Sequence, residues 1–237
     1  MIDLARWPVN VARALAAPAG RVAFDMDGTL IDTDIGEVIL RRRIAAGDAL
    51  PGLRALLGSD DVLAAYEAAL EGPEPERHYL ACALGNEGES VAGLHVRVAG
   101  LFAEGVVGPR AGLVALAKAF VAAGHEVWIV TGTLGAVAEA VAAQLGLQVS
   151  GVLGHRLRLV DGRVTGETLG PVMCGDGKVV AWRSRHADPP LMVFGDTVND
   201  LPLMEMAILG SVAVPVAAGE MADQATLRGI PVVIGIE

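Results

Sequence analysis

Short apolar runs that end in polar residues recur along this chain, and they alternate with segments that have the spacing of amphipathic helices. Three of these runs are predicted to be buried strands, because they are apolar without helical periodicity and stop at turn-forming residues. They are residues 22–24, 127–130 and 191–194. Helices are predicted between them, at 111–123, 134–145 and 178–185. Strands that alternate with helices in this way indicate a parallel sheet.

Two stretches depart from that alternation. Residues 33–105 consist of short helical pieces separated by glycine and proline, and this segment is far too long for a loop. It is therefore predicted to be an inserted helical subdomain, a cap that could exclude water from the strand ends and select a substrate. The dipeptide Asp161-Gly162 between the strand-like runs 155–160 and 163–166 predicts a β-hairpin.

The predicted fold is thus α/β, with a parallel Rossmann-like three-layer core, an inserted helical cap and an appended hairpin. Residues 1–32 and 106–237 are assigned to the core and residues 33–105 to the cap. The remaining predictions are a short amphipathic helix or arm within 1–17, a helix at 201–207, and strands at 212–214 and 232–234.

Composition narrows the range of partners. Hydrophobic residues make up 53% of the 237 residues and aromatic residues only 4%, so the core must be built from alanine, valine, leucine and isoleucine. With 28 acidic against 18 basic residues, the chain has a formal charge of −10. An acidic protein is a poor partner for nucleic acid or an anionic membrane, so neither is expected.

The two cysteines, Cys82 and Cys174, lie far apart and belong to no C-x-x-C pattern, which argues against a disulfide framework or a zinc site. No apolar run reaches membrane-spanning length, and charged residues and a proline interrupt any signal-peptide core near the start. A cytoplasmic location is therefore expected. A monomer or a homodimer is compatible with the sequence.

Polar, reactive residues follow each of the three strong strands. Asp25 and Asp27 follow the first and point to the same side, because residues two apart in an extended chain do so. Two carboxylates about 4 Å apart repel by roughly 4 kcal/mol at an effective dielectric near 20, so a cation or a proton is expected between them. Thr131-Gly132 follows the second strand, and Gly195-Asp196 with Asp200 follows the third.

Parallel strands bring their carboxyl ends to one edge of the sheet, which is where α/β proteins bind ligands. Lys178, one of only two lysines in the chain, stands before the third strand. Each of these residues also has a purely structural interpretation. Asp-x-Asp-Gly can be a solvated turn, Thr131 and Asp200 can be helix caps, and Lys178 can be an exposed residue at a helix start.

The four elements in this order resemble the motifs of the haloacid dehalogenase-like superfamily of aspartate-nucleophile phosphohydrolases. The run Phe24-Asp25-Met26-Asp27-Gly28-Thr29-Leu30 matches the D-x-D-G-T motif. The threonine, lysine and G-D-x-x-x-D motifs match at Thr131, at Lys178, and at Gly195, Asp196 and Asp200. The resemblance spans roughly residues 21–215.

The resemblance implies a magnesium-dependent phosphomonoesterase that acts on a small-molecule phosphate ester. Asp25 would be the nucleophile and Asp27 the general acid and base. Mg²⁺ would be held by Asp25, the main-chain carbonyl of Asp27 and Asp196, with Asp200 and Asn199 around it. The phosphoryl group would be bound by Thr131, the Gly132 amide and Lys178, and Asn199 is also assigned to the substrate and phosphate site.

Within the superfamily, a helical cap between the first two motifs together with Thr-Gly is similar to the phosphoserine phosphatase-like branch. The position nine residues after the nucleophile, which contacts the substrate amine in that branch, is Asp34 here, where glutamate is typical. Asp34 is also suited to be a helix N-cap, and the sequence leaves both roles open. No motif places a cap arginine for a substrate carboxylate; Arg42, Arg43 and Arg54 are candidates.

Two other functions stay compatible with the sequence. One is phosphoryl transfer to another alcohol, as in the mutases of this superfamily, and the other is a catalytically silent protein that binds a phosphorylated metabolite. Dehalogenase chemistry is disfavoured, because dehalogenases of this fold lack the acid that Asp27 would supply and the metal site.

Overall fold

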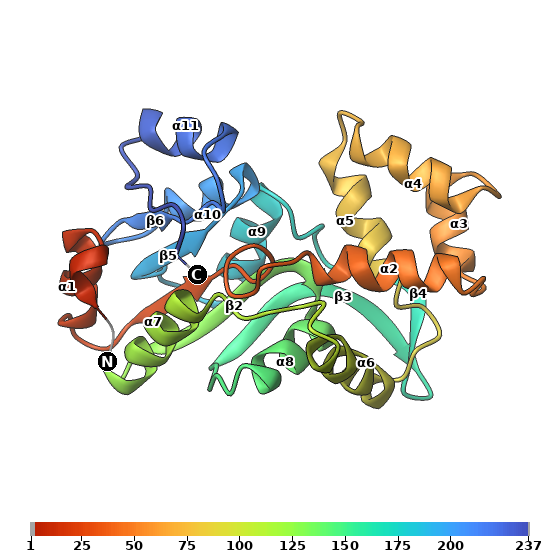
Figure 1. Ribbon diagram of the computed structural model, residues 1–237, viewed down its shortest axis with the longest axis horizontal. Coiled ribbons are helices and arrows are strands. Elements are labelled where there is room, and N and C mark those ends of the chain that lie inside the picture. The colour runs from red at the N-terminus through yellow and green to blue at the C-terminus, as the bar shows by residue number, and fades with distance from the viewer. Residues whose placement is uncertain (1–2, 237) are drawn as a thin grey trace.

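A six-stranded sheet runs through the middle of the computed structural model, which describes residues 3–236 (Figure 1). Its strands are β1 (Arg21–Phe24), β2 (Glu126–Leu134), β3 (Gly151–Val160), β4 (Arg163–Leu169), β5 (Met192–Gly195) and β6 (Ser211–Ala213). The spatial order is β4-β3-β2-β1-β5-β6, and all neighbours are parallel except the β3–β4 pair. The α/β class and the parallel core predicted from the sequence are confirmed.

Helices follow the strands and cover both faces of the sheet. Those of the core are α1 (Val9–Leu15), α7 (Ala111–Ala122), α8 (Gly135–Gln144), α9 (Asp176–Arg185), α10 (Leu201–Met204) and α11 (Glu220–Leu227). Two short 3₁₀ helices are η1 (Leu4–Arg6) and η2 (Val198–Asp200). Between β1 and β2 the chain forms α2 (Ile35–Ala45), α3 (Pro51–Leu57), α4 (Val62–Leu70), α5 (Pro75–Leu84) and α6 (Val91–Ala103).

The alternation of side chains along the strands divides the core into two parts. Val22 and Phe24 of β1 point to the face covered by α7 and α8, whereas Ala23 points to the face covered by α9 and α10. Phe24 stacks on Phe194 with ring centroids 4.5 Å apart, and Phe120 of α7 meets Phe24 edge-on at 6.2 Å. Each such fully buried ring contributes about 2–3 kcal/mol. The few aromatic residues are thus used to fix the strand that carries the first motif.

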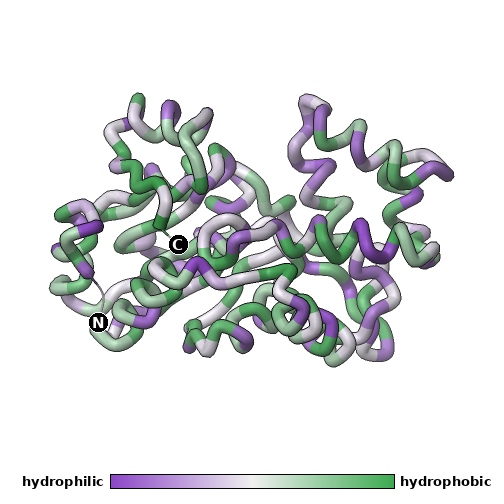
Figure 2. Tube along the Cα trace, viewed as in Figure 1, coloured by the Kyte–Doolittle hydropathy of each residue, from purple (hydrophilic) through white to green (hydrophobic). Residues whose placement is uncertain are grey.

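The inserted helices confirm the predicted helical insertion. Helices α2–α5 stand to one side of the sheet, whereas α6 packs against α8 beneath it (Figure 1). Along α2–α5 hydrophilic and hydrophobic positions alternate, as expected for helices with one packed face (Figure 2). Division of the chain at residues 33 and 105 stays a prediction.

The hairpin is present as predicted, with φ of 49° at Asp161 and 73° at Gly162 in the turn between β3 and β4. Three details of the prediction were wrong. Strand β2 continues through Thr131-Gly132-Thr133 to Leu134, with a register shift against β3 after Val130, instead of turning at 131.

The other two errors lie further toward the carboxyl end. The helix that starts at Leu201 ends at Met204, not at 207. The predicted last strand at 232–234 is only an isolated bridge between Val232 and Ala213. Helix α11 was not predicted from the sequence. None of the helices within residues 3–236 is long and apolar enough to span a membrane.

Candidate active site

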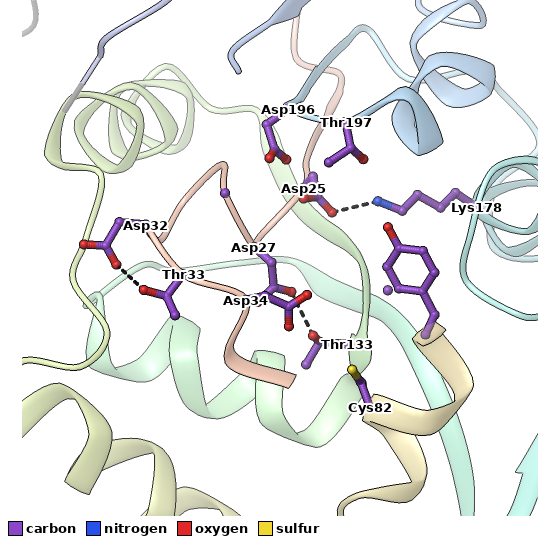
Figure 3. A pocket seen from close by; sticks show the side chains of 13 residues that line it. Asp25, Asp27, Asp32, Thr33, Asp34, Cys82, Thr133, Lys178, Asp196 and Thr197 are labelled. Atoms are coloured by element: carbon purple, nitrogen blue, oxygen red, sulfur yellow. Dashed lines mark hydrogen bonds and ion pairs between the residues drawn. The ribbon is translucent and has the colours of Figure 1, made fainter. Parts of the chain in front are cut away.

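The carboxyl ends of β2, β1 and β5 lie side by side, because these strands are neighbours in the parallel part of the sheet. Asp25, Gly132 and Asp196 stand at these ends, and they line one cavity of about 220 Å³ together with Lys178 of α9 (Figure 3). Asp27 lines the same cavity. The structure thus brings together residues from four separate parts of the sequence.

Lys178 is held by two carboxylates. Its Nζ donates to Oδ1 of Asp25 at 2.7 Å and to Oδ1 of Asp200 at 2.6 Å, and the lysine is only 3% exposed. Burial by itself lowers the pKa of Lys178, but the charges of Asp200 and Asp25 outweigh it and hold that pKa well above its ordinary value. The interpretation of Lys178 as an exposed helix-start residue is therefore wrong; it is a buried cation at the cavity wall.

Asp25, Asp196 and Asp200 form a cluster in which one carboxylate oxygen of each lies within 4.8 Å of the others. Burial first, together with the charge of Asp200, raises the pKa of Asp25 to about 7, although Lys178 opposes the shift. Burial first, and then the charges of Asp25 and Asp200, raise the pKa of Asp196 to about 9.

Three carboxylates beside a single lysine leave an excess negative charge of about two when all of them ionise. Oxygen donors in such an arrangement are what Mg²⁺ or another hard divalent cation prefers. The donor set therefore fits the magnesium ion that the sequence predicts. Burial is the main cause of the raised pKa values of Asp25 and Asp196, and the repulsion between the carboxylates, which a cation would relieve, adds to it.

Glycine is required at two points where the backbone touches this cluster. Gly28 has a φ of +70°, and a Cβ there would lie 2.0 Å from Oδ2 of Asp196. A Cβ on Gly195 would lie 2.5 Å from Cβ of Asp200. Next to Gly28, the Thr29 hydroxyl donates to Oδ1 of Asp196 at 3.1 Å. The glycines of the two motifs are there because the carboxylates pack directly on the main chain.

Asp27 is oriented by a different set of donors. Its Oδ1 accepts from the Ile35 amide at 2.9 Å, and its Oδ2 accepts from the hydroxyls of Thr131 at 3.1 Å and Thr133 at 2.8 Å. Burial, followed by the charges of Asp34 and Asp25, raises the pKa of Asp27 well above its ordinary value. The Asp27 side chain lies outside the three-carboxylate cluster, so only its main-chain carbonyl stays a predicted metal ligand.

The two threonine hydroxyls thus have a defined use in this structure. Thr131 is fully buried, donates to Asp27 and accepts from the Thr133 amide at 3.0 Å. It does not line the cavity, whereas Gly132 and Thr133 do. Phosphate binding by Thr131 stays a prediction, and orientation of Asp27 is what its contacts in this structure provide.

Gly132 is fixed from behind by His155, a residue that the sequence analysis did not select. Nδ1 of His155 lies 2.5 Å from the Gly132 carbonyl oxygen, and Nε2 accepts from the Met173 amide at 3.0 Å. Nδ1 is therefore the protonated nitrogen, and burial lowers the pKa of this histidine, which keeps it neutral. No motif indicates His155, because in the sequence it is an ordinary residue of a predicted strand.

Arg110 was also missed. It is 5% exposed, and its guanidinium donates to the carbonyls of Gly28, Val214 and Ile236, at 2.8 Å for Val214 and 3.1 Å for Ile236. It thereby ties the loop after β1 to the end of the chain. The sequence around Arg110, a single arginine after Gly108-Pro109, does not indicate these main-chain contacts.

Asn199 lies behind the cavity wall, where its side-chain amide donates a hydrogen bond to the Tyr79 hydroxyl and accepts one from the Cys174 thiol. Phosphate binding by Asn199 stays a prediction.

Asp34 stands at the rim of the cavity, where α2 begins. Its Oδ1 caps the helix by accepting from the Glu37 amide at 2.8 Å, so the predicted N-cap is confirmed. Its Oδ2 lies 3.7 Å from Nε2 of His78. A helix cap that also lines the cavity can serve a substrate with its second oxygen.

The three arginines considered as carboxylate ligands are engaged elsewhere. Arg42 pairs with Glu104, Arg54 pairs with Asp60, and the buried Arg43 pairs with Asp48 and donates to two main-chain carbonyls. None of the three is among the described residues that line the cavity.

Comparison with known proteins agrees with this geometry. Residues 22–205 match the family model of the haloacid dehalogenase-like hydrolases. A phosphoserine phosphatase of Halobacterium salinarum is 33% identical over 190 residues, which cover 78% of this chain and 82% of that protein.

Two solved structures share the fold. A protein of unknown function from Bordetella pertussis superposes with a TM-score of 0.69 and 21% identity, over 93% of this chain and 100% of that one. A substrate-bound phosphoserine phosphatase superposes with a TM-score of 0.54 and 16% identity, over 90% of this chain and 99% of that one.

Proposed function

Because the chain belongs to the haloacid dehalogenase-like hydrolases, we propose that it is a magnesium-dependent phosphatase that hydrolyses small phosphate monoesters through a phosphorylated Asp25. The observation that carries this proposal is the placement of Asp25, which is 7% exposed, between Lys178 and the Asp196 carboxylate at the wall of a small cavity. A carboxylate in this position can attack phosphorus without a separate base.

In the first step, Asp25 forms a bond to phosphorus while the bond between phosphorus and the ester oxygen breaks. Lys178 holds Oδ1 of Asp25, so we assign the attack to Oδ2. Burial raises the pKa of Asp27 and so favours its protonated form, and Asp27 delivers its proton to the departing ester oxygen. Thr131 and Thr133 hold the Asp27 carboxyl group in place for this transfer.

In the second step, Asp27 takes a proton from water, the water oxygen bonds to phosphorus, and the bond between phosphorus and Asp25 breaks to release inorganic phosphate. Lys178 neutralises charge that develops on the phosphoryl oxygens, and the Gly132 amide donates a hydrogen bond to them. Asp25, Asp196 and Asp200 would hold the magnesium ion, with the main-chain carbonyl of Asp27 as a further predicted ligand. When bound, the ion would reduce the repulsion between the nucleophile and the phosphate.

For the substrate, we propose a small ester that carries an amine. The Asp34 carboxylate lines the cavity. Its Oδ2 does not cap α2 and lies 3.7 Å from Nε2 of His78, so it can accept a hydrogen bond from a cationic group. The similarity to the phosphoserine phosphatase of Halobacterium salinarum supports the same class. Arg42, Arg43 and Arg54 form ion pairs away from the cavity and do not offer a partner for a substrate carboxylate. A phosphorylated amine that lacks a carboxylate is therefore tested as a substrate beside phosphoserine.

Hydrolysis of an aryl phosphate with and without Mg²⁺ tests the reaction, with Asp25→Asn as the inactive control. A panel of phosphoserine, phosphoethanolamine and glycerol phosphate then tests the substrate. Release of inorganic phosphate that needs both Mg²⁺ and Asp25 is the expected result. Transfer of the phosphoryl group to an added alcohol in place of water would favour a mutase-like activity, and binding without turnover would favour a silent phosphate-binding protein.

A further inference from the structure

Tyr79 reaches the cavity from the inserted helices. It belongs to α5, whereas Asp25, Gly132 and Lys178 belong to the core, and all of them line the same cavity. The Tyr79 ring lies directly on the Gly132 backbone, since a Cβ at that glycine would be 2.4 Å from Cδ1 of the ring. Gly132 is thus needed so that an aromatic residue from α5 can cover the end of β2.

The hydroxyl of Tyr79 is oriented by the core. Nδ2 of Asn199 donates to it at 2.8 Å, and Oδ1 of Asn199 accepts from the Cys174 thiol at 3.1 Å. In this orientation of the amide, Nδ2 faces Tyr79 and Oδ1 faces Cys174, so the tyrosine oxygen is the acceptor in its contact with Asn199. Its own O–H has no acceptor among residues 3–236 and remains available for donation.

We infer that Tyr79 is a catalytic residue, whose hydroxyl donates a hydrogen bond to the phosphoryl group that Asp25 attacks. This inference rests on the phosphatase activity proposed above. A neutral donor is suited to the position, because it stabilises developing negative charge without forming a competing ion pair with the nearby carboxylates. Burial raises the pKa of Tyr79, so the hydroxyl stays protonated through the working pH range.

The contact also links the inserted helices to the chemistry. The donor is in place only while α5 lies against Gly132 and Asn199, so movement of these helices away from the core would remove it from the phosphate. The same movement would open the cavity to solvent. Closure of the cavity by α5 would therefore also place the Tyr79 hydroxyl at the phosphate site.

Tyr79→Phe is the direct test, because it removes the hydroxyl and keeps the ring that covers Gly132. Tyr66→Phe is the matched control, since Tyr66 is the only other tyrosine and its hydroxyl contacts His78 and Cys82. Steady-state hydrolysis of an aryl phosphate is measured together with the affinity for inorganic phosphate by calorimetry. Thermal unfolding confirms that both variants are folded.

The expected result is a loss of about tenfold to a hundredfold in kcat/KM and a weaker affinity for inorganic phosphate in Tyr79→Phe. Tyr66→Phe should stay within about twofold of the wild type in both measurements. If Tyr79→Phe also stays within about twofold while Asp25→Asn is inactive, the role of Tyr79 is refuted and the phosphatase proposal stands. Phosphate affinity tests Tyr79 even if no ester is hydrolysed.

A double-mutant cycle with Asn199→Leu tests how the hydroxyl is oriented. Asn199→Leu should lower kcat/KM in the wild-type background and have little further effect in the Tyr79→Phe background, because both changes remove the same oriented donor. Fully additive losses would contradict orientation of Tyr79 by Asn199.

Discussion

Replacement of Asp196 by asparagine should stabilise the metal-free protein, although it removes a proposed ligand of the magnesium ion. Oxygens of Asp25, Asp196 and Asp200 lie within 4.8 Å of one another, and at that distance two full charges repel by roughly 3.5 kcal/mol at an effective dielectric of about 20. Asparagine has no charge, and its Oδ1 can still accept the hydrogen bond from the Thr29 hydroxyl.

The effect should depend on pH in a defined direction. The pKa of Asp196 rises from 3.8 to about 9 on folding, so between these values the folded protein binds more protons than the unfolded chain. A carboxyl group of this kind contributes stability at low pH that is lost as pH rises toward its folded pKa. From about pH 5 to pH 8 the full loss would be roughly 4 kcal/mol, which partial exposure of Asp196 reduces to about 2 kcal/mol.

Urea unfolding of the wild type and Asp196→Asn, in a chelator and in excess Mg²⁺, measures this directly. In chelator the variant should gain about 2 kcal/mol over the wild type at pH 8 and about zero near pH 4. Mg²⁺ at a hundred times its dissociation constant should stabilise the wild type by about 2.7 kcal/mol and the variant far less. A metal-free variant that is less stable than the wild type at pH 8, or equally stabilised by Mg²⁺, would refute the clustering of charges at this site.

Three further changes test other parts of the site. Asp27→Asn should slow hydrolysis of an alkyl phosphate about tenfold more than it slows the first phosphoryl transfer from an aryl phosphate, because an aryl leaving group needs no proton. Burst kinetics measures the first transfer, and equal losses for the two esters would contradict the role of Asp27 as an acid. Asp34→Asn should lower kcat/KM for phosphoethanolamine about tenfold and leave aryl phosphate unchanged, whereas no change with either substrate would contradict the amine contact, because asparagine keeps the helix cap. Gly132→Ala should displace Tyr79, lowering both the melting temperature and the affinity for inorganic phosphate, and calorimetry that shows neither change would contradict the close contact.

Asp25 and Asp196 were predictable from the sequence because each one directly follows a strand. The runs that end at Asp25 and Asp196 are short, apolar and sharply terminated, and parallel neighbours must end at a common edge. The predicted end of the second strand before Thr131 was wrong, because β2 continues past the motif to Leu134 and the Thr131 hydroxyl donates to Asp27. Polar residues within a strand give no signal of where the strand stops.

Tyr79 and His155 could not be predicted in this way, for a physical reason. Gly28, Gly132 and Gly195 are required because other groups press on the main chain, and a backbone without room for a Cβ leaves only one residue type. Tyr79 instead approaches with the end of a long side chain, and many helix positions could deliver such a hydroxyl to the same point. A position where a neighbouring group touches the main chain therefore requires glycine and can be recognised in the sequence. A position such as Tyr79, which reaches the site with the end of its side chain, cannot. The parts of the site that select and enclose a substrate are consequently those that require coordinates.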